Sequence, residues 1–408
     1  MAYTETTKTS WGSRLGGSLR GICTGLVLVV IGTGLLWWNE GDYVHTGDAL
    51  TEAQGITQSL GGINTVNPSL NGKLVHGIGL ATTEDVLTDP VFGVTTTAIR
   101  LERTVEFFQW QEHSESKKQK KLGGGEETVT TYTYSQGWTE SPVNSSSFHD
   151  PKARSNNVNT VLMTLEDNSI QAKNITFGAY RLPPFLANSI SGETGVAVTI
   201  PEETRAALNK QLAPPAEVPP RWWLDNTPTA SQSEVIHASG STVYIGVSPA
   251  SPKVGDVRVT FKEVRPATVS IMAKLNGDTF EQFIASNGKT VSMLRMGEHS
   301  LENMYGQAHS SNQTMTWVLR AVGTILIIAG FKMILGPIAV VADVIPLLGN
   351  VVGAGIGLVA GLVGFAWSLL VMAVAWLRFR PLIGCIMVAV AVALIAFAII
   401  KGRTGKTK

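Results

Sequence analysis

The distribution of apolar residues constrains this chain more than any other feature of its sequence. Residues 21–38 (GICTGLVLVVIGTGLLWW) carry no charge. In a helix, at about 1.5 Å per residue, they nearly cross a hydrocarbon core of about 30 Å. Apolar residues gather again after residue 316, whereas the middle of the chain is polar. The sequence therefore predicts an α+β membrane protein, with helical transmembrane segments at both ends and a β-rich soluble domain inserted between them.

The charges on either side of the first apolar stretch are unequal. The basic residues before it and the acidic residues after it are Lys8, Arg14, Arg20, Glu40 and Asp42. By the positive-inside rule, residues 1–20 form a cytoplasmic N-terminus and residues 21–38 a transmembrane helix. The alternative is a cleaved signal peptide, which needs a shorter apolar run and a cleavage site of small residues. The sequence Trp37-Trp38-Asn39-Glu40 offers no such site, so an uncleaved anchor is favoured.

The C-terminal membrane region, residues 316–400, predicts three further spans and one segment too short to cross. The spans are Trp317–Leu335, Val351–Leu377 and Leu382–Ile400. Between the first two, residues 338–348 are interrupted by polar Asp343 and by Pro346, which predicts an interfacial or re-entrant helix. With this number of crossings, the basic tail at residues 401–408 returns to the cytoplasm.

Three charged residues stand out in this region. Acidic residues inside membranes often mark ion or proton paths, so Asp343 is a possible intramembrane polar site. An acid between prolines also fits an interfacial helix, which is the competing interpretation. Arg378 and Arg380 fall in a short loop on the side opposite the basic tail, where the positive-inside rule does not expect them.

Two series of glycines recur at four-residue intervals in the apolar segments. They are Gly17, Gly21 and Gly25 near the N-terminus, and Gly353, Gly357 and Gly361 near the C-terminus. Such stripes let helix backbones approach closely in lipid, so both series are predicted to pack against other helices, within the chain or between subunits. The alternative is that glycine is simply common in membrane helices.

The polar middle of the chain contains alternating β-branched and aromatic segments, which indicate strands. It divides into β-rich extracytoplasmic regions at residues 39–213 and 229–315, joined by a proline-rich linker at residues 214–228. Ala98–Trp110 and Thr128–Trp138 are clear strand patterns, and the charged, glycine-rich Lys117–Glu127 lies between them. This arrangement predicts a long β-hairpin with a solvated tip.

Residues that often carry catalysis are present without a recognised spacing. The seven histidines are scattered, and none of their spacings matches a zinc site. They are His45, His76, His113, His149, His237, His299 and His309. We therefore expect no catalytic, cofactor-binding or metal-binding residues and no enzyme activity. The net charge of +1 gives no electrostatic footprint for nucleic acid.

Several segments resemble the transmembrane protein 43 (LUMA) family. They are LLWWNEGDYVHTGDAL, GKLVHGIGLATTEDVLTDPVFGVTTTAIRLERTVEFFQWQE, YSQGWTESPVNSSSFHDP, VGDVRVTFKEV and AWLRFRPL. The resemblance runs from Leu35 to Leu382, and Gly72–Glu112 is its most specific part. It implies one N-terminal span, a large lumenal loop and a cluster of C-terminal spans. Animal members are regarded as membrane organisers that bind inner-nuclear-membrane proteins and lamins and self-associate, and the family brings no catalytic residues.

These observations predict a non-enzymatic integral membrane scaffold or membrane-organising protein. Its large lumenal or periplasmic domain would bind partners or assemble the protein, so the expected partners are the lipid bilayer and either further copies or other membrane proteins. The expected location is the inner membrane if the chain is bacterial, and the endoplasmic reticulum and nuclear envelope if it is eukaryotic. The alternatives are a transporter or channel built from the C-terminal helices and a membrane-anchored envelope enzyme.

Overall fold

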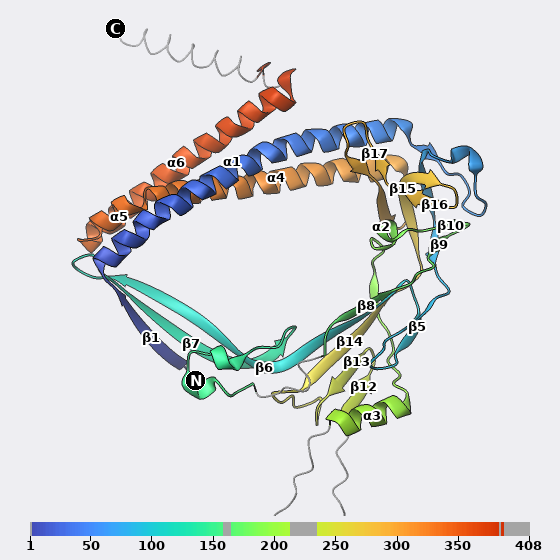
Figure 1. Cartoon of the computed structure of the whole chain (residues 1–408), viewed down its shortest axis with the longest axis horizontal. Coiled ribbons are helices and arrows are strands. Elements are labelled where there is room, and N and C mark those ends of the chain that lie inside the picture. The colour runs from blue at the N-terminus through green and yellow to red at the C-terminus, as the bar shows by residue number, and fades with distance from the viewer. Residues whose placement is uncertain (1, 158–164, 213–234, 383–384, 387–408) are drawn as a thin grey trace, which may run out of the picture.

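The computed structural model describes residues 2–157, 165–212, 235–382 and 385–386. Long helices from the two ends of the chain form a layer, and a β-rich region curves from one end of that layer to the other (Figure 1). The predicted α+β class, with membrane-capable helices at both ends and a β-rich centre, is therefore confirmed.

Within the described residues, three long helices make up the helical layer. They are α1 (Trp11–Ile56), α4 (Leu301–Ile334) and α6 (Pro346–Phe379), and each contains a stretch long and apolar enough to cross a membrane. Helices α1 and α4 run side by side, and α6 lies beside the half of this pair that carries the apolar stretches (Figure 1). The short helix α5 (Gly336–Ala342) connects α4 to α6 at the end of the layer where α1 begins.

The structure extends the predicted transmembrane helix, residues 21–38, at both ends. Helix α1 begins earlier because the Ser10 side chain caps it by accepting a hydrogen bond from Ser13 N at 3.2 Å. It also continues through residues 39–56, which were expected in the β-rich region. Residues 301–315, expected there too, form the first half of α4.

Tertiary packing explains these two corrections. Ala49, Leu50 and Ala53 of α1 are buried in one cluster with Met304 and Tyr305 of α4. This cluster joins the helix pair to the strands behind it, so the helices continue past the membrane segment as part of the soluble core.

The predicted interfacial or re-entrant segment, residues 338–348, contains most of α5, a turn at Asp343 and the start of α6. Pro346 is the first residue of α6, a position where its missing N–H costs nothing. The predicted span Val351–Leu377 lies inside α6. The linker at 214–228, most of the span at 382–400 and the tail at 401–408 lie outside the described residues.

The strands in the described part of the chain form two main sheets and two small hairpins. In the eight-stranded sheet, the order β1-β7-β6-β14-β13-β12 is joined by β8, which pairs with β6, and by β11, which pairs with β14. These strands are β1 (Ala2–Thr9), β6 (Arg100–Lys120), β7 (Glu126–Thr139), β8 (Asn168–Gln171), β11 (Glu193–Gly195), β12 (Ile236–Ser239), β13 (Thr242–Ile245) and β14 (Val257–Val264).

The seven-stranded sheet has the order β19-β15-β16-β10-β9-β3-β2, and β15 also pairs directly with β3. Its strands are β2 (Gln58–Ser59), β3 (Leu74–Thr82), β9 (Thr176–Phe177), β10 (Tyr180–Arg181), β15 (Ala267–Asn276), β16 (Thr279–Glu281) and β19 (Met293–Met296). The two hairpins are β4 (Val86–Thr88) with β5 (Thr95–Thr97), and β17 (Phe283–Ile284) with β18 (Thr290–Val291). Among the described residues, the region also contains the short α-helices α2 (Pro184–Ala187) and α3 (Glu202–Leu212). Its 3-10 helices are Pro68–Leu70, Ser145–Ser147 and Pro151–Ala153.

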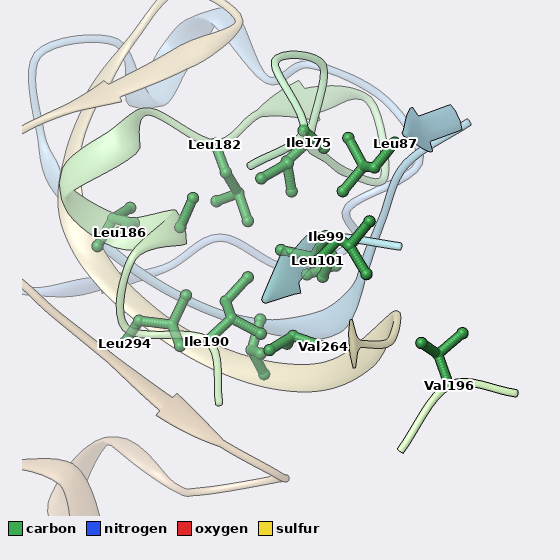
Figure 2. Packing of buried hydrophobic residues seen from close by; sticks show 14 of the residues in the cluster. Leu87, Ile99, Leu101, Ile175, Leu182, Leu186, Ile190, Val196, Val264 and Leu294 are labelled. Carbon is green, nitrogen blue, oxygen red and sulfur yellow. The ribbon is translucent and has the colours of Figure 1, made fainter. Parts of the chain in front are cut away.

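One apolar core is shared by the two sheets. Strand β14 shows how the sequence builds it, because Val257, Val259 and Phe261 alternate inward while Arg258 and Thr260 face outward. Figure 2 shows the part of this core that lies against α2, where Leu186 of α2 and Leu294 of β19 are buried. Within the described residues, this cluster contains no residue of α1, α4 or α6.

A long ribbon projects from this core, and we call it the β arm: β1, β7 and residues 108–120 of β6. Strand β6 has 21 residues, so at about 3.4 Å per residue it extends roughly 70 Å. The hairpin predicted around Lys117–Glu127 is the turn between β6 and β7, where Gly123 and Gly124 have φ of 85° and 78°. The arm reaches the end of the helical layer where α1 begins (Figure 1).

The pairing of β1 with β7 differs from the predicted topology, which placed residues 1–20 and the hairpin on opposite sides of the membrane. The two strands are antiparallel neighbours from Ala2, opposite Thr133, to Thr9, opposite Glu126. Because Arg14 and Lys120 both bind Asp343, β1 and the turn of the β arm lie at the same end of α1. The positive-inside rule considers only charges beside a span, so it could not detect this long-range pairing.

Candidate functional site

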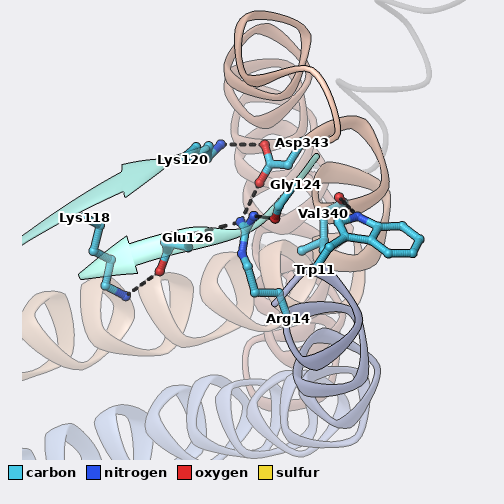
Figure 3. Close-up of polar contacts among 8 residues, drawn as sticks. All are labelled: Trp11, Arg14, Lys118, Lys120, Gly124, Glu126, Val340 and Asp343. Atoms are coloured by element: carbon cyan, nitrogen blue, oxygen red, sulfur yellow. Dashed lines mark hydrogen bonds and ion pairs between the residues drawn. The ribbon is translucent and has the colours of Figure 1, made fainter. Parts of the chain in front are cut away.

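Asp343, the predicted polar site, lies in a cluster of charges at the end of the helical layer where α1 begins. Its side chain is only 2% exposed. Arg14 of α1 donates from Nη2 to Asp343 Oδ2 at 2.5 Å, and Lys120 of β6 donates from Nζ to Oδ1 at 2.6 Å. We call these three residues the Asp343 clamp, because they join α1, the end of α5 and the β arm (Figure 3).

The turn of the β arm also docks through backbone contacts. Arg14 donates from Nη1 to Gly124 O at 2.6 Å, and Gly123 N donates to Val344 O at 3.1 Å. Trp11 of α1, whose Nε1 donates to Val340 O of α5 at 2.9 Å, lies beside the turn. A Cβ on Gly124 would lie 2.2 Å from Trp11 Cδ1, so only glycine fits beneath the indole. The turn is therefore shaped to sit on the first turn of α1 (Figure 3).

Two cations bind the single carboxylate of the Asp343 clamp, and Glu126 lies 3.7 Å from Arg14. Burial raises the pKa of Asp343, but the hydrogen bonds from Lys120 and Arg14 and the two positive charges outweigh it, so the pKa lies below its usual value. The carboxylate is therefore ionised at neutral pH. Each of its oxygens accepts a hydrogen bond from a different element, so the clamp connects α1 and the β arm to the end of α5.

A second cluster of polar residues, which the sequence analysis missed, joins all three long helices. Arg320 of α4 donates to Glu40 of α1 from Nε at 2.6 Å and from Nη2 at 2.7 Å. Trp376 of α6 donates from Nε1 to the same carboxylate at 2.7 Å. We call these residues the Glu40 clamp. The sequence shows one acidic residue and one basic residue at the ends of different apolar stretches. These residues can be recognised as a pair only when the positions of the two helices relative to each other are known.

The two clamps are separated by the thickness of a bilayer. Arg14 and Glu40 are 26 residues apart on α1 (40 − 14), which at about 1.5 Å per residue is about 39 Å. A hydrocarbon core is about 30 Å thick. The clamps therefore lie near the two interfaces, and the apolar parts of the three helices lie between them.

Glycines allow α1 and α4 to approach closely between the clamps. A Cβ on Gly25 would lie 2.6 Å from Gly330 O, and one on Gly32 would lie 2.9 Å from Gly323 O. Of the predicted N-terminal series, Gly25 is thus at a close helix contact and Gly21 reaches Met333 at 4.0 Å.

The remaining predicted glycines have no such neighbour in the part of the chain that the structure describes. No heavy atom lies within 4 Å of a Cβ placed on Gly17, Gly353, Gly357 or Gly361. Packing at the C-terminal series therefore stays a prediction. A close contact between α6 and α4 instead uses Gly364, whose Cβ would lie 2.7 Å from Ile328 Cγ1.

Comparison with known proteins agrees with this architecture. The family model described as Transmembrane protein 43 matches residues 107–381, which is most of the chain. The chain belongs to the transmembrane protein 43 family. Its helices and its family together make it an integral membrane protein.

Relatives in the family align along most of their length. The chain is 28% identical to mouse transmembrane protein 43 over 387 residues, covering 91% of this chain and 89% of the relative. It is 27% identical to the human protein over 379 residues, covering 90% and 87%. The fruit-fly homolog is 25% identical over 377 residues, covering 90% of each chain. No solved structure matches this chain.

The names of these relatives state a transmembrane protein and no activity. Within the described residues, no group of three or more His, Cys, Asp or Glu side chains could hold a metal ion. His76 of β3 contacts His299 O at 3.0 Å through Nε2, and burial lowers its pKa. A backbone carbonyl partner and a lowered pKa suit a neutral structural histidine.

The β arm carries a small hollow of about 240 Å³ beside Tyr134. Trp110, Tyr134, Asp150, Lys152, Ala153 and Asn156 line it. Burial and the hydrogen bond that Tyr134 donates to Glu112 raise the pKa of this phenol to about 12. Tyr134 therefore stays protonated at neutral pH and cannot act there as a general base.

Proposed function

We propose that this member of the transmembrane protein 43 family is a non-enzymatic scaffold of its membrane. It assembles with further copies or with other membrane proteins through its large extramembrane domain. We propose neither a nucleic-acid partner nor a cofactor for this protein. The compartment stays a prediction: a bacterial inner membrane, or the endoplasmic reticulum and nuclear envelope.

The observation that carries this proposal is the attachment of the β arm at both of its ends. At one end β6 continues into the apolar core beside β14, and at the other the Asp343 clamp fastens the turn to α1 and α5. A polar ribbon that is held this way keeps a fixed position relative to the membrane helices. Such a surface suits protein contacts better than the binding of a small molecule in a cavity.

The same contacts weaken the transport alternative. That alternative depends on Asp343 as an ion or proton site within the membrane. Arg14 and Lys120 occupy both carboxylate oxygens, and the lowered pKa keeps the group ionised. A carrier site instead needs a group that binds and releases its ion readily.

Assembly can be tested on the full-length chain in its own membrane. Membranes would be treated with a lysine-reactive crosslinker, and the protein would then be purified in mild detergent and weighed by native mass spectrometry. We expect crosslinked multimers or stoichiometric complexes with other membrane proteins. A monomer without any stoichiometric partner, both in crosslinked membranes and in detergent, would contradict the proposal.

The β arm can be tested separately by substitution on its exposed side. Lys117 and Glu115 are 82% and 75% exposed and lie on the outer half of β6, so Lys117→Trp and Glu115→Trp would place bulky groups on the arm without disturbing the core. We expect these variants to reduce assembly. Lys274→Trp on β15 of the other sheet is the control, and an equal loss with it would argue against the arm as the assembly surface.

A further inference from the structure

Two arginines at the end of α6 have no acidic partner among the described residues. Arg378 is exposed in the last turn, and Arg380 is the C-cap, where the backbone leaves the helix with φ −137° and ψ 66°. The neighbouring acids of α1 are engaged elsewhere, since Glu40 binds Arg320 and Asp42 binds a lysine beside β18. Two cations therefore remain unneutralised within the described part of the chain.

Aromatic rings hold both guanidinium groups in place. The Arg380 guanidinium lies 4.6 Å from the ring centroid of Tyr43, and the Arg378 guanidinium lies 5.7 Å from that of Phe379. The Phe379 ring is itself packed against Trp37 at 5.7 Å. Contact with a ring face restrains a guanidinium plane and leaves its N–H donors at the edge free for another ligand.

The pair lies at the depth of lipid headgroups. A Cβ on Gly41 would lie 2.8 Å from the Phe379 ring, so the end of α6 is level with the Glu40 clamp. That clamp marks the interface next to the β domain. Trp38, one turn earlier on α1, is 57% exposed, as expected of an indole in the headgroup region.

Phosphate is the ligand that fits these groups. A guanidinium presents a planar fork of donors that binds phosphate oxygens in pairs, and charge-assisted bonds of this kind are about twice as strong as neutral ones. The positive-inside rule leaves the two arginines unexplained as topology signals. Simple snorkelling to water explains one exposed arginine, but it does not explain two that are held on aromatic rings.

We propose that Arg378 and Arg380 bind the headgroup phosphate of an anionic phospholipid at the interface next to the β domain. Tyr43 and Phe379 position the two guanidinium groups, and exposed Trp38 contacts the adjacent acyl and glycerol region. This proposal requires that the chain inserts into a membrane, but it does not depend on the proposed scaffold function.

The test uses native mass spectrometry of the full-length chain in mild detergent with added lipid. We expect dioleoyl phosphatidylglycerol to be retained in preference to dioleoyl phosphatidylcholine. The double variant Arg378→Gln/Arg380→Gln should lose this retention by about tenfold, the factor that corresponds to one charge-assisted hydrogen bond. The control Arg181→Gln/Arg265→Gln removes two exposed arginines of the β domain and should retain lipid as the parent chain does.

Several outcomes would overturn the proposal. One is equal retention of phosphatidylglycerol by the double variant and the parent chain, and another is an equal loss in the control. A third is displacement of the lipid by an equimolar amount of inorganic phosphate, which would indicate a site for free anions. If the double variant does not elute as a folded protein, the single variant Arg378→Gln is tested in its place, because that side chain is exposed.

Discussion

Glu40 of α1 and Arg320 of α4 form a two-point ion pair, with both carboxylate oxygens within 2.7 Å of the guanidinium. Glu40 is 1% exposed, and the indole of Trp376 on α6 completes its hydrogen bonding. The guanidinium also lies 4.7 Å from the centroid of the Trp317 ring. One buried carboxylate thus holds three membrane helices together at the interface next to the β domain.

We expect Glu40→Gln to lower the free energy of unfolding by about 3 kcal/mol, because it leaves the Arg320 charge buried without its counter-ion. Thermal and denaturant unfolding of the purified protein in detergent would measure the change. Glu281→Gln is the matched control, since it breaks a partly exposed pair with Lys274 that is worth less than about 1 kcal/mol. Similar effects of the two substitutions would show that the Glu40 clamp does not hold the helices.

Removal of the Asp343 carboxylate should release the turn of the β arm while the soluble core stays folded. We expect Asp343→Asn to increase the rate of trypsin cleavage after Lys120 and Lys121 several-fold, because two cations lose their shared partner. Cleavage sites would be identified by mass spectrometry. Glu115→Gln serves as the control, because its pair with Lys117 is exposed to solvent. Unchanged cleavage of the Asp343 variant would mean that backbone contacts alone hold the turn.

The close approach of α1 and α4 should not tolerate a methyl group. We expect Gly25→Ala to destabilise the protein by roughly 2 kcal/mol, because its Cβ would lie 2.6 Å from Gly330 O and the helices would have to separate. Gly357→Ala on α6 is the control, as no described atom lies within 4 Å of that Cβ. Thermal unfolding in detergent compares the two. A greater loss from Gly357→Ala would instead indicate a contact of α6 outside the described chain.

Pairing of β1 with β7 can be tested by a disulfide. Thr4 and Thr131 lie opposite each other, so Thr4→Cys/Thr131→Cys in a chain with Cys23→Ser and Cys385→Ser should crosslink within one molecule under mild oxidation. Peptide mapping would detect the bond. The control pair, Thr4→Cys/Thr97→Cys, joins β1 to the separate β4–β5 hairpin and should stay reduced. A reduced Thr4–Thr131 pair in intact membranes would place the two strands in different compartments.

Protonation of His76 should weaken the fold at mildly acidic pH. Burial lowers its pKa below 6.5, with a smaller opposing effect of the bond to His299 O, so the unfolded chain binds the proton more readily. Stability from this residue is complete above pH 6.5 and decreases as the pH falls below it. We expect His76→Gln to reduce the dependence of the melting temperature on pH between about 7 and 5. His113→Gln, at an exposed residue of the β arm, is the control substitution.

The apolar segments and the alternating segments could be predicted from the local sequence. Residues 21–38 and 351–377 are long and uncharged enough to require a membrane, and both lie within helices of the structure. Alternation in Ala98–Trp110 and Thr128–Trp138 likewise indicated the strands that became β6 and β7. Each of these patterns depends only on residues close together in the chain, so the element could be predicted from the sequence.

The candidate site could be predicted only in part from the sequence. Asp343 was noticed as an anomaly, but its partners Arg14 and Lys120 are more than 200 residues away in sequence. Glu40 was seen only as one of the acidic residues after the first apolar stretch, and no partner was assigned to it. A charged residue in an apolar segment indicates that a partner is needed, but its position in the sequence does not identify that partner.

The sequence by itself determined that this chain inserts helices into a membrane and folds a β-rich region between them, because hydropathy and alternation act through residues close together in the chain. Tertiary structure alone decided where the helices end, which glycines touch, and that the N-terminal strand joins the β arm. Those features depend on contacts between α1, α4 and the hairpin, which form only after the chain has brought distant segments together. Their energies come from packing and buried ion pairs, which no local pattern records.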